Sequence, residues 1–481
     1  MVDSAPSSSS PISTSSNDDP RLGLTVNAIN WDTLSTIACQ LYQVSSAKWG
    51  EQVSGGYNVV RFLHLDDTTN TVLAARVPYQ PVDGMTDERA DALCGRICSE
   101  VATMEYISMH SRIPIPRVVR HSIDRDGGGV GSPYILMTKV DGVPLCSVWD
   151  DMDDSKREVV LQQVIDILLQ LSSLRFNSIG ALMKGDGVTK PTWHIVPMSI
   201  VKDPYGSAVL STTSHRTYTS ALDYWVAYAN AKLQRIIDDH FGDDNWGDYT
   251  MFWFMRSLIP SLYDSSLDAS GFPITPGDFH SQNIMITDTD SPSPCISAVI
   301  DWEFTVTLPT SSFAQYPLFI VDHPFWEADH PLKTRNMQDQ ATFNRLMLAS
   351  ESRLHPGEET SLSRAFATCR GLYLFEQCMQ DSMMFCALYE DLFQHIFCEY
   401  DSKESFSGSY TYALTNGILK NQTAQFEKEA DVRKEAIIVL GEDLVPYEIS
   451  RSEFRALVLE NADKFAEGGE VHSWLATYGK L

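Results

Sequence analysis

The sequence lacks any apolar run long enough to cross a membrane, and it is poor in basic residues. No stretch of its 481 residues approaches the roughly 18 apolar residues that a spanning helix requires. Its 36 Lys and Arg residues are outnumbered by 63 Asp and Glu residues, which gives a net charge of −27. Nucleic acids and anionic membrane surfaces both attract basic segments, so the charge argues against either partner. An acidic protein better suits a neutral or cationic small molecule.

The cysteines also lack a pattern, because the nine of them include no C-x-x-C motif. Scattered thiols in odd number are typical of a reducing compartment, and we interpret Cys94 and Cys98 as two core thiols. Residues 1–20 have neither the apolar stretch of a secretory signal nor the basic residues of a mitochondrial leader. They are rich in Ser, Pro and Asp, which predicts a disordered tail over residues 1–22. We expect a cytoplasmic location.

The most informative segment begins at Gly277 with Gly-Asp-Phe-His-Ser-Gln-Asn and ends at Glu303 with Val-Ile-Asp-Trp-Glu. It contains Asp278, Asn283 and, eighteen residues later, Asp301. Phosphoryl transfer from a nucleotide needs one carboxylate to accept a hydroxyl proton. It also needs oxygen ligands for magnesium, which are typically an Asn and a second Asp. The segment carries these groups in that order.

Two short apolar stretches, residues 284–286 and 296–300, flank a polar turn and predict a β-hairpin. Such a hairpin would bring Asn283, at its start, close to Asp301, at its end. Two oxygen ligands placed this way suit magnesium, which takes few protein ligands and completes its shell with phosphate and water. Either Asp by itself is more simply a turn cap, but the joint pattern favours a phosphate and metal site.

With these residues, the segment resembles the catalytic core of the aminoglycoside phosphotransferase and choline kinase-like enzymes, particularly fungal proteins with that domain. The resemblance covers roughly residues 53–309. It implies a protein-kinase-like, bilobal α+β fold and the phosphorylation of a small-molecule hydroxyl with ATP and Mg²⁺. It also implies that Asp278 is the catalytic base and that Asn283 and Asp301 hold magnesium. The family usually has a His that braces the loop where this chain has Pro276.

The same resemblance places a nucleotide-holding lobe upstream. Gly55 and Gly56 lie in a turn where the backbone could approach phosphates closely, although paired glycines are also common in plain hairpins. Arg76 stands where protein kinases have Lys, and its guanidinium can grip phosphate oxygens in a fork. Its implied partner is Glu100, on a helix predicted over residues 87–110. The alternative is that both are ordinary surface charges.

A strand predicted over residues 133–140 leads, in the family, into the hinge where adenine bonds to the backbone. Met137 and Lys139 are assigned to the nucleotide site by this similarity alone. The glycine run of residues 127–129 is interpreted as a hairpin loop, because no helix follows it to direct a dipole at an anion.

Helical spacing dominates the rest of the chain. Predicted helices cover residues 155–174, 220–240, 250–263, 338–351, 359–400 (broken once or twice), 422–440 and 452–466. We therefore expect a five-stranded N-terminal lobe over residues 23–139, a mainly helical C-terminal lobe over residues 140–440 and a helical extension over residues 441–481. Candidates for the acceptor site are Trp193, Asp223, Trp225, Asp238, Asp239, Asp243 and Asp244. A core or loop role is the simpler reading of these residues.

Three functions stay open on the sequence. The first is a kinase of a small-molecule alcohol. The second is a catalytically silent kinase-like protein that binds nucleotide or a partner, a reading supported by Pro276 and Arg76. The third is a protein kinase, which is disfavoured because Asp301 is followed by Trp-Glu and no Ala-Pro-Glu segment is recognisable.

Overall fold

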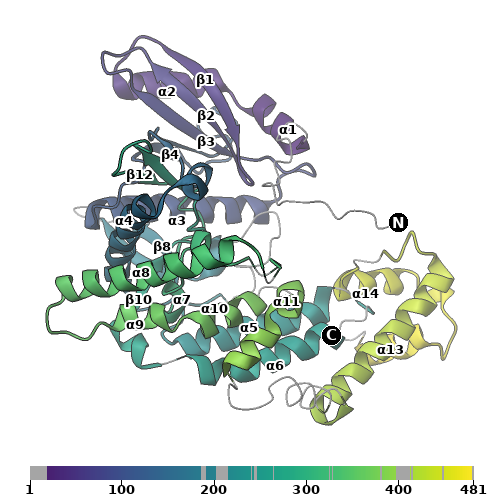
Figure 1. Cartoon of the computed structure of the whole chain (residues 1–481). Coiled ribbons are helices and arrows are strands. Elements are labelled where there is room, and N and C mark those ends of the chain that lie inside the picture. The colour runs from purple at the N-terminus through teal and green to yellow at the C-terminus, as the bar shows by residue number, and fades with distance from the viewer. Residues whose placement is uncertain are drawn as a thin grey trace, which may run out of the picture.

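The structure is a computed structural model of the chain. It describes residues 19–185, 191–201, 215–239, 241–242, 246–263, 265–323, 325–327, 329–379, 382–396, 412, 415–446 and 449–478. Figure 1 shows the β-sheet of the N-terminal part at the top and the helical remainder below it. The C-terminal helices, in yellow, lie at one side of the helical part. The α+β architecture expected from the sequence, with a β-rich N-terminal part and a mainly helical C-terminal part, is confirmed.

The N-terminal part is built on one antiparallel sheet of five strands. In spatial order these are β1 (Ala47–Ser54), β2 (Asn58–Leu65), β3 (Val72–Pro78), β5 (Tyr134–Thr138) and β4 (Val118–Ser122). The central strand β3 is buried from Leu73 onwards because helices cover both faces of the sheet. Its side chains alternate between the two faces. Leu73, Ala75 and Val77 pack in one core, whereas Ala74 packs in another.

The first of these faces is covered by two helices that the sequence did not predict, α1 (Pro20–Ala28) and α2 (Trp31–Tyr42). Asp19 caps α1 by accepting the backbone N–H of Arg21, and Pro20 opens the helix. Both features favour a helix start. The predicted tail is therefore wrong for residues 19–22, and residues 1–18 lie outside the described part.

The opposite face of the sheet is covered by α3 (Asp87–His110), close to the range predicted for it. Thr86 caps this helix, and two acidic residues in its first turn suit the positive end of the helix dipole. Leu93, Ile97 and Val101 form the apolar side that meets the sheet. The same side of the helix also buries Arg96 and Glu100.

The chain leaves the sheet after β5 and enters a second, three-stranded sheet of order β12-β11-β6. Gly142 precedes β6 (Val143–Pro144) with a φ of +114°, and a Cβ there would lie 2.5 Å from the carbonyl oxygen of Ile286. This close approach requires glycine. The other two strands, β11 (Ile284–Thr287) and β12 (Cys295–Val299), form the predicted hairpin.

The remainder is mainly helical, as predicted, but it also contains a small antiparallel sheet that the sequence analysis missed. That sheet has the order β7 (Arg175–Phe176), β10 (Phe272–Thr275), β13 (Val306–Thr307), β8 (Gly180–Gly185) and β9 (Thr192–Val196). Two of these strands have only two residues, too few for a recognisable alternation. The helices around it are α4 (Asp154–Ser173), α5 (Ala221–Asp239), α6 (Trp246–Leu262), α7 (Thr310–Phe313), α8 (Leu332–Leu354), α9 (Ser361–Ala367), α10 (Arg370–Cys378) and α11 (Ser382–Ile396).

The C-terminal helices α13 (Gly417–Leu440), α14 (Arg451–Glu460) and α15 (Glu470–Tyr478) share a core of their own. Phe241, Phe454 and Trp474 stack at its centre. Ser450 and Glu453 form a capping box at the start of α14. None of the helices in the described part of the chain combines the length and apolar character that a transmembrane span requires.

One carboxylate, Glu376 on α10, lies among aromatic side chains and is held by neutral donors. It accepts hydrogen bonds from the Tyr263 hydroxyl (2.8 Å), the Ser312 hydroxyl (2.7 Å) and the Gln315 amide. Burial raises the pKa of Glu376 to about 7, although these hydrogen bonds oppose the rise. The folded protein therefore holds a proton here over a pH range in which the unfolded chain has lost it.

A raised pKa in the folded state means that stability is lost as the pH rises through that pKa. We expect Glu376→Gln to gain stability over the wild type between pH 5 and pH 8. A gain on the order of 3 kcal/mol follows from about 1.4 kcal/mol per pKa unit. The amide of Gln315 can rotate to accept the new N–H. Thermal unfolding of both proteins across this range measures the difference, and a difference independent of pH would contradict the assignment.

Candidate active site

The first element of the candidate site is the loop between β10 and β11, which carries Asp278. The Asp278 side chain is 51% exposed, and its Oδ1 lies 2.9 Å from His280 Nε2. Asn283 donates its amide hydrogens to the Asp278 carbonyl (3.0 Å) and to Oδ2 (3.2 Å). The loop therefore holds the carboxylate through its own side chains, without a donor at Pro276.

His280 has a defined tautomer in this loop. The backbone N–H of Gln282 donates to Nδ1 of His280 at 3.1 Å, so the ring proton sits on Nε2 and points at Asp278. The hydrogen bond to Asp278 raises the pKa of His280, while partial burial opposes the rise.

Asn283 and Asp301 are brought together by the hairpin, as the sequence predicts. The backbone N–H of Ile300 donates to the carbonyl of Asn283 at 2.9 Å, which joins the start of β11 to the residue before Asp301. Asp301 has a left-handed backbone with a φ of +60°, and Phe304 has one with a φ of +57°. Strained backbone is typical of functional sites, where the surrounding structure enforces it.

These two residues fit magnesium as partial ligands. The amide N–H groups of Asn283 face Asp278, so its carbonyl oxygen is the atom left for a cation. Asp301 adds a carboxylate that is 38% exposed. Among the described residues no group of three or more His, Cys, Asp or Glu could hold a metal. A metal here would therefore need phosphate oxygens and water to complete its shell, as magnesium does beside nucleotides.

Arg76 and Glu100 form the ion pair that the sequence predicts, and both are buried, so the alternative of surface charges is wrong. Arg76 lies on the α3 side of the central strand. Its Nη1 contacts Glu100, and its Nη2 contacts Asp301 at 2.8 Å and also Glu303. Burial raises the pKa of Glu100, and Arg76 opposes that rise. Glu303, for which the sequence favours a supporting or packing role at least as much as direct chemistry, thus takes part through Arg76.

The glycine turn lies next to this segment. Gly55 and Gly56 are exposed at the tip between β1 and β2, and neither has the left-handed backbone that only glycine tolerates well. The following residues reach the segment that carries Asp301. The Tyr57 ring meets Phe304 edge-on at 5.7 Å, and Asn58 donates to Glu303 at 3.0 Å. The residues after the turn therefore pack against the segment that carries Asp301.

The remaining nucleotide candidates have structural contacts of their own. Met137 is buried in the core beneath α3. The Lys139 ammonium lies 4.8 Å from the centre of the Phe62 ring, and its backbone N–H donates to Val72 at 3.0 Å. These contacts hold the end of β5. A role for either residue in binding adenine stays a prediction.

The acceptor candidates from the sequence are scattered. Trp225 is buried and stacks on Tyr263 at 5.5 Å, so the core reading is correct for it. Trp193 meets Tyr106 edge-on at 5.3 Å. Asp238 accepts a hydrogen bond from Gln234, and Asp223 is exposed. Asp243 and Asp244 lie outside the described residues, and no side-chain contact of Asp239 is described.

Two cavities that the sequence did not predict lie beyond the loop that carries Asp278. The first, which we call the loop cavity, has a volume of about 440 Å³ and reaches Ser281 of the Asp278 loop. It is lined by Cys146, Trp149, Asp150, Ser281, Leu318, Phe319, Val321, Asp322, His323, Trp326, Leu332, Arg335, Asn336, Tyr373, Gln377 and Met384. No local pattern could reveal it, because its walls come from six separate parts of the chain.

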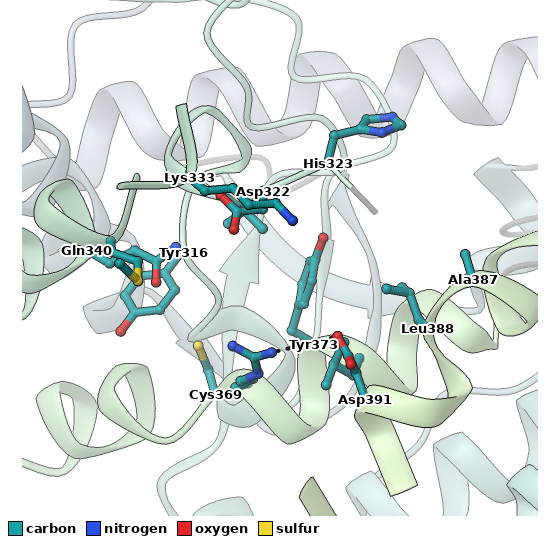
Figure 2. Close-up of a pocket in the computed structure, with 14 residues that line it drawn as sticks. Tyr316, Asp322, His323, Lys333, Gln340, Cys369, Tyr373, Ala387, Leu388 and Asp391 are labelled. Atoms are coloured by element: carbon teal, nitrogen blue, oxygen red, sulfur yellow. Dashed lines mark ion pairs between the residues drawn. The ribbon is translucent and has the colours of Figure 1, made fainter. Parts of the chain in front are cut away.

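The second, which we call the distal cavity, has a volume of about 290 Å³ and shares four wall residues with the first. These are Val321, Asp322, His323 and Tyr373. In Figure 2 the Tyr373 ring stands between the loop that carries Asp322 and the helix that carries Leu388. None of the residues predicted for catalysis or nucleotide binding lines this cavity.

No family model matches this chain. Its curated relatives are fungal proteins named "Altered inheritance of mitochondria protein 9, mitochondrial". The chain is 28% identical to the Candida glabrata protein over 137 residues, 25% of this chain and 20% of that protein. It is 30% identical to the Clavispora lusitaniae protein over 131 residues, 26% and 20% of the two chains. The chain is thus a distant relative that spans about a fifth of their length.

Solved structures with a similar fold are aminoglycoside and macrolide phosphotransferases. The GDP complex of aminoglycoside 2'-phosphotransferase-IIIa aligns with 77% of this chain and all of its own, at 12% identity and a TM-score of 0.38. The macrolide 2'-phosphotransferase MphH from Brachybacterium faecium aligns with 74% of this chain and 98% of its own, at 12% identity and a TM-score of 0.39. These likenesses concern the fold alone.

The cytoplasmic location expected from the sequence is contradicted, because the curated relatives bear mitochondrial names. The composition could not predict the location, for a physical reason. Free, scattered thiols argue against an oxidising compartment, but they do not distinguish one reducing compartment from another. Addresses within the cell are signals recognised by receptors, and net charge and core composition do not record them.

The contact between His280 and Asp278 leads to a testable prediction. We expect the imidazole pKa of His280 to lie above the ordinary value of 6.5 in the wild type and to fall in Asp278→Asn, because the amide no longer favours the cation. NMR titration of histidine-labelled protein measures both values. His121, whose pKa is lowered by burial, is the internal control and should titrate alike in the two proteins. An unchanged His280 pKa would show that Asp278 does not hold it.

Proposed function

We propose that the chain is an ATP- and magnesium-dependent phosphotransferase that phosphorylates a hydroxyl group of a small molecule. One observation carries the proposal. A single cluster joins Asp278 to Asn283 by hydrogen bonds, Asn283 to the residue before Asp301 through the hairpin, and Asp301 to the buried cation Arg76. A base, two oxygen ligands and a phosphate-binding cation are the groups that phosphoryl transfer requires.

In this proposal, each residue has one chemical task. Asp278 accepts the proton of the acceptor hydroxyl as its oxygen forms a bond to the γ-phosphorus and the bond to the ADP oxygen breaks. Asn283 and Asp301 would hold magnesium, which neutralises the charge of the phosphates. Arg76, held by Glu100, would bind phosphate oxygens. The exposure of the Asp278 carboxylate is consistent with a group that must meet a substrate.

The loop cavity is the proposed acceptor site, because it reaches the catalytic loop at Ser281. Three buried polar atoms of the residues that line it have no hydrogen-bond partner, namely Trp149 Nε1, Asn336 Oδ1 and Arg335 Nε. Trp149 Nε1 and Asn336 Oδ1 belong to residues that are only 3% and 1% exposed. Buried polar groups are normally paired, so these two atoms suit a polar ligand. Asp150 is already paired with Arg335 of the same wall at 2.7 Å, so the Asp322 carboxylate and the aromatic rings of the walls are the features that favour a neutral or cationic acceptor.

A second candidate function is a catalytically silent protein that keeps the fold. The observation in its favour is that Nη2 of Arg76 is already engaged by two carboxylates, Asp301 and Glu303. A nucleotide phosphate would have to replace at least one of these contacts.

The divisions of the chain into lobes at residues 139/140 and 440/441 also remain proposals.

The decisive test is thermal stability with ATP alone, magnesium alone and both together. We expect a rise in Tm that requires both ligands, since a ligand at 100 times its Kd stabilises a native state by about 2.7 kcal/mol. Asp301→Ala should abolish the rise, because it removes a metal ligand, whereas Asp278→Ala should retain it and abolish only turnover. No shift in the wild type at saturating nucleotide would refute the proposal and favour the silent protein.

The loop cavity can be tested once a screen of hydroxyl-bearing metabolites for ATP consumption has identified an acceptor. We expect Trp149→Phe to raise the KM for the acceptor about 2- to 12-fold, the equivalent of one neutral hydrogen bond, with the KM for ATP unchanged. Trp474→Phe is the matched control. Trp474 is also buried with an unpartnered Nε1, but it lies in the core of the C-terminal helices. Equal KM values for wild type and Trp149→Phe would place the acceptor elsewhere.

A further inference from the structure

Glu303 is a buried carboxylate that joins the segment of Asp301 to three N-terminal elements. Its side chain is 4% exposed. Oε2 accepts hydrogen bonds from Asn58 on β2, at 3.0 Å, and from Arg76 on β3. Oε1 lies 2.5 Å from Nη1 of Arg96 on α3. No other residue in the described part of the chain is shown to contact these three elements together through one carboxylate.

Arg96 is the second cation of this cluster and is 2% exposed. Its guanidinium lies 5.6 Å from the centre of the Tyr57 ring and 5.7 Å from that of Phe304, at cation–π distance from both. Tyr57 follows the glycine turn and Phe304 follows Glu303. Arg96 therefore holds the turn and the Asp301 segment against the same face of α3.

The buried charges of the cluster balance only if Arg96 is counted. Arg76 and Arg96 contribute two positive charges, and Glu100 and Glu303 contribute two negative charges. Asp301 is the fifth charged group and the most exposed of them. A buried charge without a partner is strongly unfavourable, and each of the two glutamates is in contact with a guanidinium. Arg96 thus gives Glu303 a second cation beside the pair of Arg76 and Glu100.

This balance explains why Arg76 stands where protein kinases have Lys. Glu100 occupies one terminal nitrogen of the guanidinium, and Asp301 and Glu303 share the other. A planar fork supports such divided contacts, whereas an ammonium group offers a single nitrogen. If Asp301 turned to a metal, Glu100 and Glu303 would still fix Arg76 from two directions.

We propose that Glu303 and Arg96 are positioning residues that hold Arg76, Asp301 and the glycine turn in place for a metal-bound nucleotide. This inference rests on the proposed function. Neither residue touches the nucleotide. Glu303 acts through Arg76 and Asn58, and Arg96 acts through Glu303, Tyr57 and Phe304. With this pair, the contact between Arg76 on β3 and Glu100 on α3 becomes part of a larger buried cluster. The cluster consists of Glu100, Arg76, Glu303 and Arg96 in contact in that order, and we call it the ladder.

The test is the affinity of the full chain for ATP, measured by calorimetry as a function of magnesium concentration, in wild type and Glu303→Gln. We expect Glu303→Gln to weaken ATP binding in magnesium about tenfold, as for the loss of one charge-assisted hydrogen bond. It should also raise the magnesium concentration needed for half-maximal binding. Loss of packing alone would not change the magnesium requirement, so this readout separates positioning from stability.

The matched control is Glu429→Gln. Glu429 is 2% exposed and pairs with Arg451 at 2.7 Å, so the same chemical change removes a buried ion pair among the C-terminal helices. We expect it to lower Tm by an amount similar to that of Glu303→Gln and to leave ATP affinity unchanged. Equal losses of ATP affinity in the two variants would overturn the proposal, because the effect would then be one of general stability.

A second variant covers the case in which Glu303→Gln folds poorly. The double variant Arg96→Met with Glu303→Gln removes one charge of each sign and leaves Arg76 paired with Glu100. If the ladder acts as a unit, the double variant should bind ATP no more weakly than Arg96→Met alone. A further loss of affinity in the double variant would overturn the ladder. If the wild type itself binds no ATP, the proposed function fails; if it binds and Glu303→Gln binds equally well, only the positioning role fails.

Discussion

The buried guanidinium of Arg76 is the group around which the N-terminal half of the site is arranged. It lies on the central strand of a sheet that helices cover on both faces, so it has lost most of its water. Removing a charge from water is tolerable only if carboxylates replace the solvent with good geometry. The carboxylates come from two places: Glu100 of α3 points towards the sheet, and residues 301–303 lie against β3. Sheet, helix and hairpin thus meet at one side chain.

The charged groups of the site differ in exposure. Asp278 and Asp301 are partly open to solvent, whereas Glu303, Arg96 and Glu100 are closed from it. Polar contacts fix a geometry best where water cannot compete for them. The left-handed backbone at Asp301 is consistent with this division, since it marks a position that the surrounding contacts impose on the chain.

The two cavities are organised differently. The loop cavity and the distal cavity are bounded by aromatic and apolar side chains, with charged groups spaced around the walls. Tyr373 and Asp322 line both cavities, so the two share part of one wall. A fold does not by itself select a ligand, so the side chains of these walls decide what each cavity can bind.

The sequence by itself determined the parts of this protein whose causes are local. The hairpin that joins Asn283 to Asp301, the strands around Arg76 and the long helices follow from periodicity and turn residues, and all are present. It also indicated the pair of Arg76 and Glu100. Only the tertiary structure decided that Glu303 and Arg96 complete this pair and that Trp149 lines a cavity. Contacts between residues hundreds of positions apart depend on how elements pack, and packing leaves no periodic trace along the chain.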